Sequence, residues 1–321
     1  MISLSKVCYL ILAHNDIANL KRLVDSINYQ ADFIIHIDKK SDILPFKKLF
    51  LGYENISFLD DKLRSKIYWG GFSIVQAEIN LVNEALKRKK KYIKYVLLSG
   101  ADYPIKPAQY IYDYLLKNEQ IEFIRGINMD QHPQKYFFSK HIDVYQIHDY
   151  PFIRNTNSKF FYYLRASVNK LLRRIKLTNK VRCHAFDLYQ GSQWWALSYE
   201  CLVELMDIYD KDKDSFVNFR FGMFAPDEKF FHTLFFQSKY REKNIVGGED
   251  TPMQLDNEND MTIQTANLAN IHLLDTSMTK WFNEDDFEAI SKSEKLFVRK
   301  VKTGYSDELL DLIDKKILKV G

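Results

Sequence analysis

Short continuous apolar runs alternate with amphipathic stretches over the first hundred residues. The apolar runs, each followed by polar residues, lie at residues 7–13, 33–38, 55–59 and 95–98. Uninterrupted runs of this length are typical of strands buried on both faces of a parallel sheet. Residues 16–29 and 72–88 instead repeat their apolar side chains at helical spacing. The pattern predicts an α/β fold with a mostly parallel central sheet flanked by helices.

The second half of the chain is less regular. Residues 128–180 are irregular and then helical from 160 to 176, and we interpret them as an insertion that shapes one side of a ligand site. Strand character returns at residues 191–198, where Ser198 is placed to cap a helix. The later elements expected are a helix over 199–209, a helix opened by Pro226, a polar loop over 242–266, a short strand over 271–274, a helix over 283–291, an apolar segment over 296–301 and an amphipathic helix over 306–320.

Two features of the charge and helix pattern leave alternatives open. The apolar face of the last helix packs on the domain in one interpretation and contacts a membrane or a partner in the other. Basic runs at residues 87–91 and 171–176 are interpreted either as solvated helix ends or as peripheral contacts with an anionic membrane face. The net charge of the whole chain is only +4, and no nucleic-acid-reading motif accompanies it, so we expect no nucleic-acid partner.

Composition and cysteine usage narrow the class of protein. The 321 residues are 46% hydrophobic and 27% charged, which is typical of a globular chain with a large core. The odd count and unpaired spacing of Cys8, Cys183 and Cys201 argue against a disulfide framework and a zinc site. No apolar stretch approaches the roughly eighteen residues of a membrane span, and the N-terminal run lacks a cleavage site. We expect a cytoplasmic protein. A peripheral position on the inner face of the membrane is compatible with this expectation.

Polar side chains cluster where the predicted strands end, which is the edge at which parallel sheets bind ligands. Ala13 and His14 follow the first strand, Asp38 follows the second, and Asp102 follows the fourth. These residues are candidates to bind a nucleotide or its sugar, and structural turns are the alternative for the two acids. No Gly-x-Gly-x-x-Gly or Gly-Lys-Ser/Thr loop is present, so a dinucleotide fold or a P-loop kinase is unsupported.

Seven short motifs follow one another along nearly the whole chain, from about residue 7 to residue 301. Each motif is weak alone, but their shared order and spacing make a strong signal. Together they resemble the core-2/I-branching β-1,6-N-acetylglucosaminyltransferase family, which also contains the peptide O-xylosyltransferases, and the chain looks like a bacterial-type member. The motifs are YLILAHND (9–16), HIDKK (36–40), YWGGFS (68–73), LSGADYPIK (98–106), GSQWW (191–195), PDE (226–228) and LFVRK (296–300).

The resemblance implies a GT-A-like fold, a UDP-sugar donor, inversion at the anomeric carbon and no metal. It suggests one domain over residues 1–301, with a donor half to about 127 and an acceptor and catalytic half from 128, followed by a C-terminal amphipathic helix over 302–321. Many sugar transferases hold a metal with Asp-x-Asp after a strand, but here Asp102 stands alone in that position. Acidic stretches at 210–214 and 256–260 are interpreted as solvated loops.

The resemblance assigns the chemistry to residues late in the chain. Glu228 matches the catalytic base of the family, and the first turn of a helix would keep its carboxylate ionised; complementing the helix N-terminus is the alternative for Asp227 and Glu228. Arg299 and Lys300 match the basic residues that replace a metal at the diphosphate, as their geometry and charge suit phosphate oxygens. His272 stands near a position where some members carry a further Arg, and it is either a phosphate contact or structural.

Aromatic side chains complete the expected site. Trp194 and Trp195 are adjacent on a strand and face opposite ways, so one should be core and the other should line the sugar pocket with Trp69 and Asp227. The favoured donors are UDP-N-acetylglucosamine and UDP-xylose, and the acceptor is a glycan or lipid-linked glycan of a surface polysaccharide. Two rivals stay open: a catalytically inactive glycan- or membrane-binding protein of the same fold, and a metal-dependent transferase.

Overall fold

The computed structural model describes residues 6–142, 149, 159–174, 186–216, 219–220 and 223–319. The sequence-based expectations for Cys183, for much of the expected insertion and for the two ends of the chain lie outside these residues. Cys8 and Cys201 are both buried and free. Within the described residues, no helix has the length and apolar character required to cross a bilayer.

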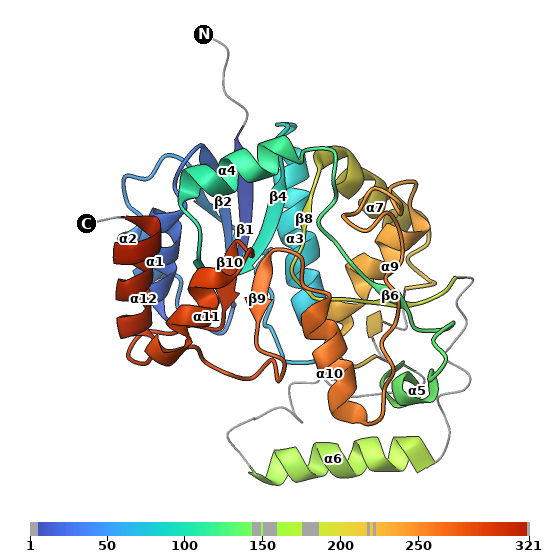
Figure 1. Cartoon of the computed structure of the whole chain (residues 1–321). Helices are drawn as coiled ribbons and strands as arrows, with labels where there is room; N and C mark the ends of the chain where they lie inside the picture. Colours follow the sequence, from blue (N-terminus) through green and yellow to red (C-terminus); the bar gives the residue numbers. More distant parts are fainter. Residues whose placement is uncertain are drawn as a thin grey trace.

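A five-stranded sheet forms the centre of the fold, with the strand order β3-β2-β1-β4-β8. The strands are β1 Val7–Ala13, β2 Ala31–Ile37, β3 Ile56–Phe58, β4 Tyr95–Ser99 and β8 Ala196–Leu197. The first four are parallel, and β8 pairs antiparallel with β4. The four apolar runs of the first hundred residues therefore become the four parallel strands, and β1 and β4 lie side by side at the centre (Figure 1).

Helices cover both faces of this sheet. One face packs against α1 Ile17–Ser26, α4 Ala108–Lys117 and α12 Asp307–Ile313, and the other against α3 Ser73–Lys87, α7 Tyr199–Lys211 and α9 Phe230–Gln237 (Figure 1). Alternate residues of β1 enter the two cores: Tyr9 and Ile11 pack on the first face, Leu10 and Leu12 on the second. The predicted α/β fold with a mostly parallel sheet flanked by helices is confirmed.

A smaller sheet lies against the end of β4. It contains β5 Asp102–Pro104, β10 Phe297–Arg299 and β9 His272–Leu274, with β10 in the middle. β10 runs antiparallel to β5 and parallel to β9, which sets Arg299 opposite Asp102 and Phe297 opposite His272. This pairing brings a segment from the end of the chain to the ligand-binding edge of the central sheet. Two further strands, β6 Ile127–Asn128 and β7 Tyr189–Gln190, pair antiparallel.

The remaining elements include one that the sequence analysis did not anticipate. Residues 242–266 were expected to be a polar loop, but α10 begins at Glu258. Its start is fixed by a capping box, in which Asn257 accepts from the Asn259 amide and Asp260 accepts from the Asn257 amide. The other elements are α2 Leu44–Leu49, α5 Tyr136–Ile142, α6 Lys159–Arg174, α10 Glu258–Asn267, α11 Phe287–Lys292, the short helical turns Pro226–Glu228 and Glu284–Asp286, and the π-turn Asp314–Leu318.

Two predicted helix features have clear outcomes. Ser198 caps α7, because its side chain accepts a hydrogen bond from the Cys201 amide. In the described part of the last helix, Leu309, Leu310 and Ile313 are buried in the core. The apolar face of that helix therefore packs on the domain rather than facing a membrane.

Candidate active site

A cavity of about 1010 Å³ opens where β1 and β4 end. The chain leaves β1 through α1 on one face and reaches β4 through α3 on the other, so the sheet has a topological switch point here, where α/β folds bind ligands. The cavity is lined by seven of the predicted residues, namely Ala13, His14, Asp38, Trp69, Trp194, Arg299 and Lys300. The structure thus brings together segments that lie almost 300 residues apart in the sequence.

Arg299 is the most firmly held cation of the cavity. Its Nη1 donates to Asp102 Oδ1 at 2.9 Å and also to Ser99 Oγ. Its guanidinium lies over the ring of Trp194, with 4.3 Å from Cζ to the ring centroid. The side chain keeps 18% exposure at the cavity wall. The guanidinium is therefore fixed on one face by an aromatic ring and at one edge by a carboxylate, and its other donors are available to an anion.

Asp102 holds Arg299 in place rather than facing the ligand, which corrects the sequence-based assignment. Its carboxylate is fully buried and accepts from the Ser99 amide at 2.7 Å as well as from Arg299. Burial alone would raise the pKa of Asp102, but the adjacent charge of Arg299, together with the interactions with His272 and the Ser99 amide, outweighs burial and lowers the pKa to about 2. A permanently ionised, enclosed carboxylate can orient the guanidinium but cannot contact a nucleotide.

His272 is likewise behind the cavity wall, so it does not serve as a phosphate contact. It is 1% exposed, its Nε2 lies 3.1 Å from Asp102 Oδ2, and its ring stacks on Phe297. Burial lowers its pKa despite the nearby carboxylate. The imidazole is therefore neutral at neutral pH and supports Asp102 from the side opposite Arg299. Of the two roles left open for His272, the structure places it in the structural one.

Further cations line the same cavity. Lys300 is half-buried, and burial followed by repulsion from Arg299 lowers its pKa. Lys302 lies over the ring of Trp281, with 4.9 Å from Nζ to the centroid, and Lys40 completes the group near Asp38. Lys302 and Trp281 were not singled out from the sequence, although Lys302 stands only two residues beyond the Arg-Lys pair. Four positive side chains around one cavity suit a strongly anionic group.

The residues expected to bind a nucleotide lie at the opposite wall. The Asp38 amide donates to the carbonyl of Ala13, so the ends of β1 and β2 are fixed together. Asp38 Oδ1 accepts from the Lys40 amide at 2.8 Å, which is the turn role, while the side chain still lines the cavity. His14 is exposed at the cavity, and partial desolvation of its imidazole by the surrounding wall lowers its pKa. Both interpretations of Asp38, ligand and turn, are therefore compatible with its position.

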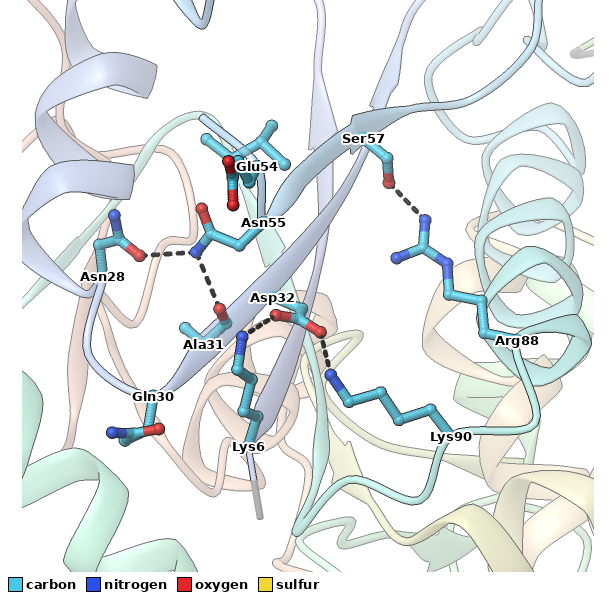
Figure 2. A pocket seen from close by; sticks show the side chains of 11 residues that line it. Lys6, Asn28, Gln30, Ala31, Asp32, Glu54, Asn55, Ser57, Arg88 and Lys90 are labelled. Carbon is cyan, nitrogen blue, oxygen red and sulfur yellow. Dashed lines mark hydrogen bonds and ion pairs between the residues drawn. The ribbon is translucent and has the colours of Figure 1, made fainter. Parts of the chain in front are cut away.

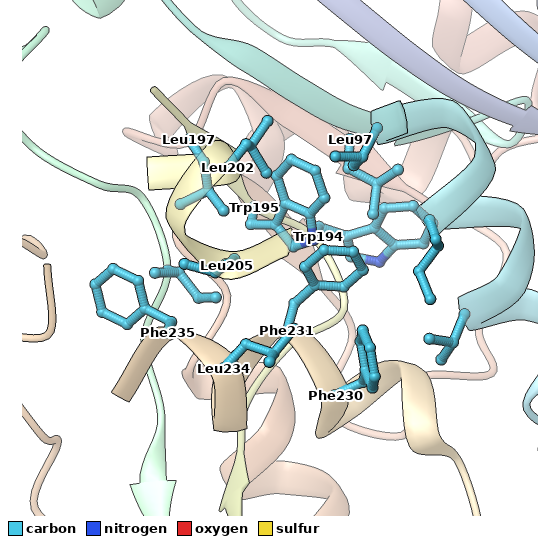
Figure 3. Packing of buried hydrophobic residues seen from close by; sticks show 14 of the residues in the cluster. Leu97, Trp194, Trp195, Leu197, Leu202, Leu205, Phe230, Phe231, Leu234 and Phe235 are labelled. Atoms are coloured by element: carbon cyan, nitrogen blue, oxygen red, sulfur yellow. The ribbon is translucent and has the colours of Figure 1, made fainter. Parts of the chain in front are cut away.

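The three tryptophans divide as their surroundings dictate. Trp195 is fully buried and packs on Phe231 (Figure 3), so it is the core residue of the adjacent pair and does not line the sugar pocket. Trp194 is also almost fully buried, and its ring supports Arg299 at the cavity wall. Trp69 is 76% exposed at the cavity rim and meets Phe224 edge-on. Most of the Trp69 side chain is therefore exposed where the cavity meets solvent.

Glu228 and Asp227 are not among the residues that line the cavity. They lie on the turn Pro226–Glu228, and the Glu228 side chain keeps 20% exposure. Its Oε2 accepts weakly from Gln190 at 3.5 Å and lies 3.9 Å from Lys229 Nζ.

A buried carboxyl group connects the cavity wall to the Pro-Asp-Glu turn. Gln193 lines the cavity and donates to Glu78 Oε1 at 2.6 Å. Glu78 is fully buried on α3, and burial followed by repulsion from Asp227 raises its pKa well above the ordinary range. The positive charge of Arg299 also acts on Asp227. Glu78 was missed from the sequence, although an acid inside the apolar stripe of a helix was the available signal.

The charge state of Glu228 differs from the expectation. A helix N-terminus was expected to keep this carboxylate ionised, but α9 begins only at Phe230. Burial, opposed by Lys229 and assisted by Asp227, raises the pKa of Glu228 to about 7. A carboxylate with a pKa near neutrality can accept a proton and release it again, which suits a general base.

The alternative metal-binding stretches lie elsewhere. Asp210 pairs with Lys213 at the end of α7, and Asp260 caps α10. Within the part of the chain that the structure describes, no three His, Cys, Asp or Glu side chains gather in a group that could hold a metal ion. The 210–214 stretch is exposed as expected, whereas the 256–260 stretch is the start of α10 and not a loop.

A second cavity, of about 590 Å³, lies at the opposite edge, where β1, β2 and β3 begin (Figure 2). It contains part of the first basic run. Lys6 and Lys90 both donate to Asp32, at 2.7 and 2.6 Å, and Arg88 donates to Ser57. These cations are engaged with the protein itself, so the cavity is a weaker candidate for an anionic ligand than the switch point.

Known proteins resemble this chain over different lengths. The profile of the Core-2/I-branching enzyme family matches residues 7–283. A xylosyltransferase of Ciona intestinalis is 29% identical over 126 residues, which are 38% of this chain and 14% of that protein. Xylosyltransferase 2 of Homo sapiens is 27% identical over 130 residues, 39% of this chain and 15% of that protein.

A third relative carries a different name. A Sus scrofa protein named probable beta-1,3-galactosyl-O-glycosyl-glycoprotein beta-1,6-N-acetylglucosaminyltransferase 7 is 30% identical over 113 residues, 34% of this chain and 26% of that protein. The matched region thus spans about a quarter or less of the length of these relatives. The family match, by contrast, runs from β1 through β9 and ends before β10, the strand that carries Arg299. The chain therefore belongs to the Core-2/I-branching enzyme family of glycosyltransferases.

Proposed function

We propose that this protein transfers a sugar from a UDP-sugar to a hydroxyl of a glycan acceptor, with inversion and without a metal. The observation that carries the proposal is the position of Arg299, which Asp102 and Trp194 hold at the wall of a large cavity with three lysines nearby. Fixed cations stabilise the charge that develops on a leaving diphosphate. A nucleoside diphosphate is the leaving group that this cavity suits in size and charge.

The reaction needs one displacement at the anomeric carbon. The oxygen of the acceptor hydroxyl attacks that carbon while its bond to the diphosphate oxygen breaks, and UDP leaves with the electron pair. The hydroxyl proton passes to the carboxylate of Glu228. Attack on the face opposite the leaving group inverts the anomeric configuration. Arg299 and Lys300 act on the leaving group, and Glu228 acts on the nucleophile.

The donor sugar and the biological setting are further proposals. The relatives named as xylosyltransferases and as an N-acetylglucosaminyltransferase favour xylose and N-acetylglucosamine as the transferred sugar. Trp69 lines the cavity and is 76% exposed, so an aromatic ring lies where a pyranose of donor or acceptor would bind. We propose a glycan or lipid-linked glycan acceptor used in surface polysaccharide synthesis, with the enzyme in the cytoplasm at the inner face of the membrane.

A panel of UDP-sugars tests the function. Release of UDP and formation of glycoside should occur with one donor, and Glu228→Gln should lower the rate at least about 100-fold while UDP still binds. Glu242→Gln, which changes an exposed acid in the same way, is the matched control and should be fully active. The proposal also expects full activity in EDTA.

Three results would contradict the proposal. Activity restored only by manganese would support the metal-dependent rival. Glycan binding without turnover, unchanged in Glu228→Gln, would support the inactive binding protein. Retention of the anomeric configuration in the product would exclude a single displacement.

A further inference from the structure

Helix α6, residues Lys159–Arg174, turns an apolar stripe away from the protein. Phe160 is 68% exposed, Leu164 38% and Leu171 58%. With about 100° between successive residues, these three positions fall on one face of the helix. Figure 1 shows α6 set apart from the layers around the sheet. Asn169, on the opposite side of the helix, is buried.

α6 exposes this part of its apolar surface, while Phe161, Val168 and Leu172 on the adjoining face are half-buried. An amphipathic helix of a globular domain normally turns its apolar stripe to the core and its polar face to water. α7 does so, with Leu202 and Leu205 fully buried. In α6 the stripe does not contact the core formed by the described residues, so an apolar environment for it must come from outside the domain.

The charge of α6 indicates which environment fits. Its sequence, KFFYYLRASVNKLLRR, contains five Lys or Arg residues and no Asp or Glu. Lys170 and Arg174 are exposed and fall beside the stripe. A helix with exposed Phe and Leu flanked by cations is complementary to a bilayer surface that carries negative headgroups. A uniformly apolar partner surface would leave these cations without counter-charge.

The place of α6 in the molecule fits the same partner. β1 and β4 run toward the side of the molecule on which α6 lies, and the cavity opens where these strands end (Figure 1). A membrane under α6 would therefore lie on the side of the cavity. The other basic run, residues 87–91, lies at the opposite edge, where Lys90 pairs with Asp32 and Lys91 with Glu200.

We propose that α6 docks the protein on an anionic membrane surface. The helix lies flat at the headgroup level, with Phe160, Leu164 and Leu171 inserted toward the acyl chains and Lys170 and Arg174 against anionic headgroups. The proposal does not depend on sugar transfer. It assigns the contact with lipid to α6 and not to the basic run at residues 87–91.

Co-sedimentation of the full chain with vesicles tests the docking. The protein should bind phosphatidylcholine vesicles that contain phosphatidylglycerol, and bind pure phosphatidylcholine vesicles far less. The double variant Lys170→Glu/Arg174→Glu should lower the partition coefficient about tenfold or more, as should Leu171→Asp. Lys87→Glu/Lys89→Glu and Leu51→Asp, which make the same changes at exposed positions elsewhere, should bind as the wild type does.

Several results would overturn the docking. They are equal binding to both kinds of vesicle, no binding, or loss of binding in Lys87→Glu/Lys89→Glu instead of the α6 variant. Self-association that Leu171→Asp abolishes would mean that the stripe is an interface between two copies. Circular dichroism and Tm establish that each variant is folded. If Leu171→Asp is destabilised, vesicle binding by Lys170→Glu/Arg174→Glu, which alters only exposed side chains, tests the docking.

The same variants separate this inference from the proposed function. With a water-soluble acceptor and no vesicles, the α6 variants should transfer sugar at the wild-type rate. A protein that binds vesicles but transfers no sugar would refute the function and leave the docking in place. One that transfers sugar but ignores anionic vesicles would refute only the docking.

Discussion

At the scale of single residues, burial changed the roles that residue type suggested. Asp102 and His272 have the chemistry of ligand contacts, yet both are enclosed: Asp102 accepts from Arg299, and His272 contacts Asp102. The sequence indicated that one of the adjacent tryptophans should be core, and the structure decided that it is Trp195. These side chains are buried by residues from distant parts of the chain, so a local sequence pattern cannot predict their burial.

The raised pKa of Glu228 predicts a pH profile. A base must be ionised to accept a proton, so kcat/KM should rise with pH and level off above about 7, the pKa to which burial raises this carboxylate. Below that pH the rate should fall about tenfold per unit. The measurement is kcat/KM for the free enzyme from pH 5 to 9. A profile already flat at pH 5 would show that the carboxylate titrates near its ordinary value and that burial does not control it.

At the scale of elements, the small sheet is the device that positions the diphosphate site. β10 supplies Arg299, β5 supplies Asp102, and β9 supplies His272, so each strand contributes one member of the network. The apolar pattern predicted the segments of β9 and β10, but it did not predict β5. Three-residue strands carry too little periodicity to be recognised alone, and their pairing across almost 200 residues is a tertiary feature.

Removal of the charge of Asp102 should weaken the donor site selectively. Asp102→Asn keeps the size of the side chain but loses the ion pair with Arg299, a charge-assisted bond of about 1.5–3 kcal/mol. The KM for the UDP-sugar should rise about tenfold to a hundredfold, and the KM for the acceptor should stay the same. Initial rates with each substrate varied in turn provide the test. An equal change in both constants would indicate a general structural defect and not a positioning role.

At the scale of the whole molecule, ligand binding should be coupled to stability through the switch-point cavity. A ligand that binds only the folded state stabilises it by about 2.7 kcal/mol at one hundred times Kd. UDP should therefore raise Tm, and Arg299→Ala should abolish the shift. Arg88→Ala, at the second cavity, is the control and should leave the shift intact. If Arg88→Ala abolished the UDP-induced rise in Tm and Arg299→Ala did not, the nucleotide would bind at the opposite edge of the sheet.

The sequence alone determined the parallel strands, the helices between them, the polar ends of those strands and the family. Continuous apolar runs and helical spacing are local properties, so they can be seen without neighbours. The capping box of α10 was also local, but it was overlooked in a stretch without apolar periodicity. Most of the residues named for the site do meet at one cavity.

Only the tertiary structure decided which of those residues face the cavity and in which charge state. Glu228, expected to stay ionised at a helix start, has its pKa raised by burial, while Arg299 lowers that of the buried Asp102. The exposed stripe of α6 is a further case, since a helical pattern defines an apolar face but not its direction. Periodicity is fixed by adjacent residues, whereas burial and electrostatic fields depend on segments that meet only in the folded chain.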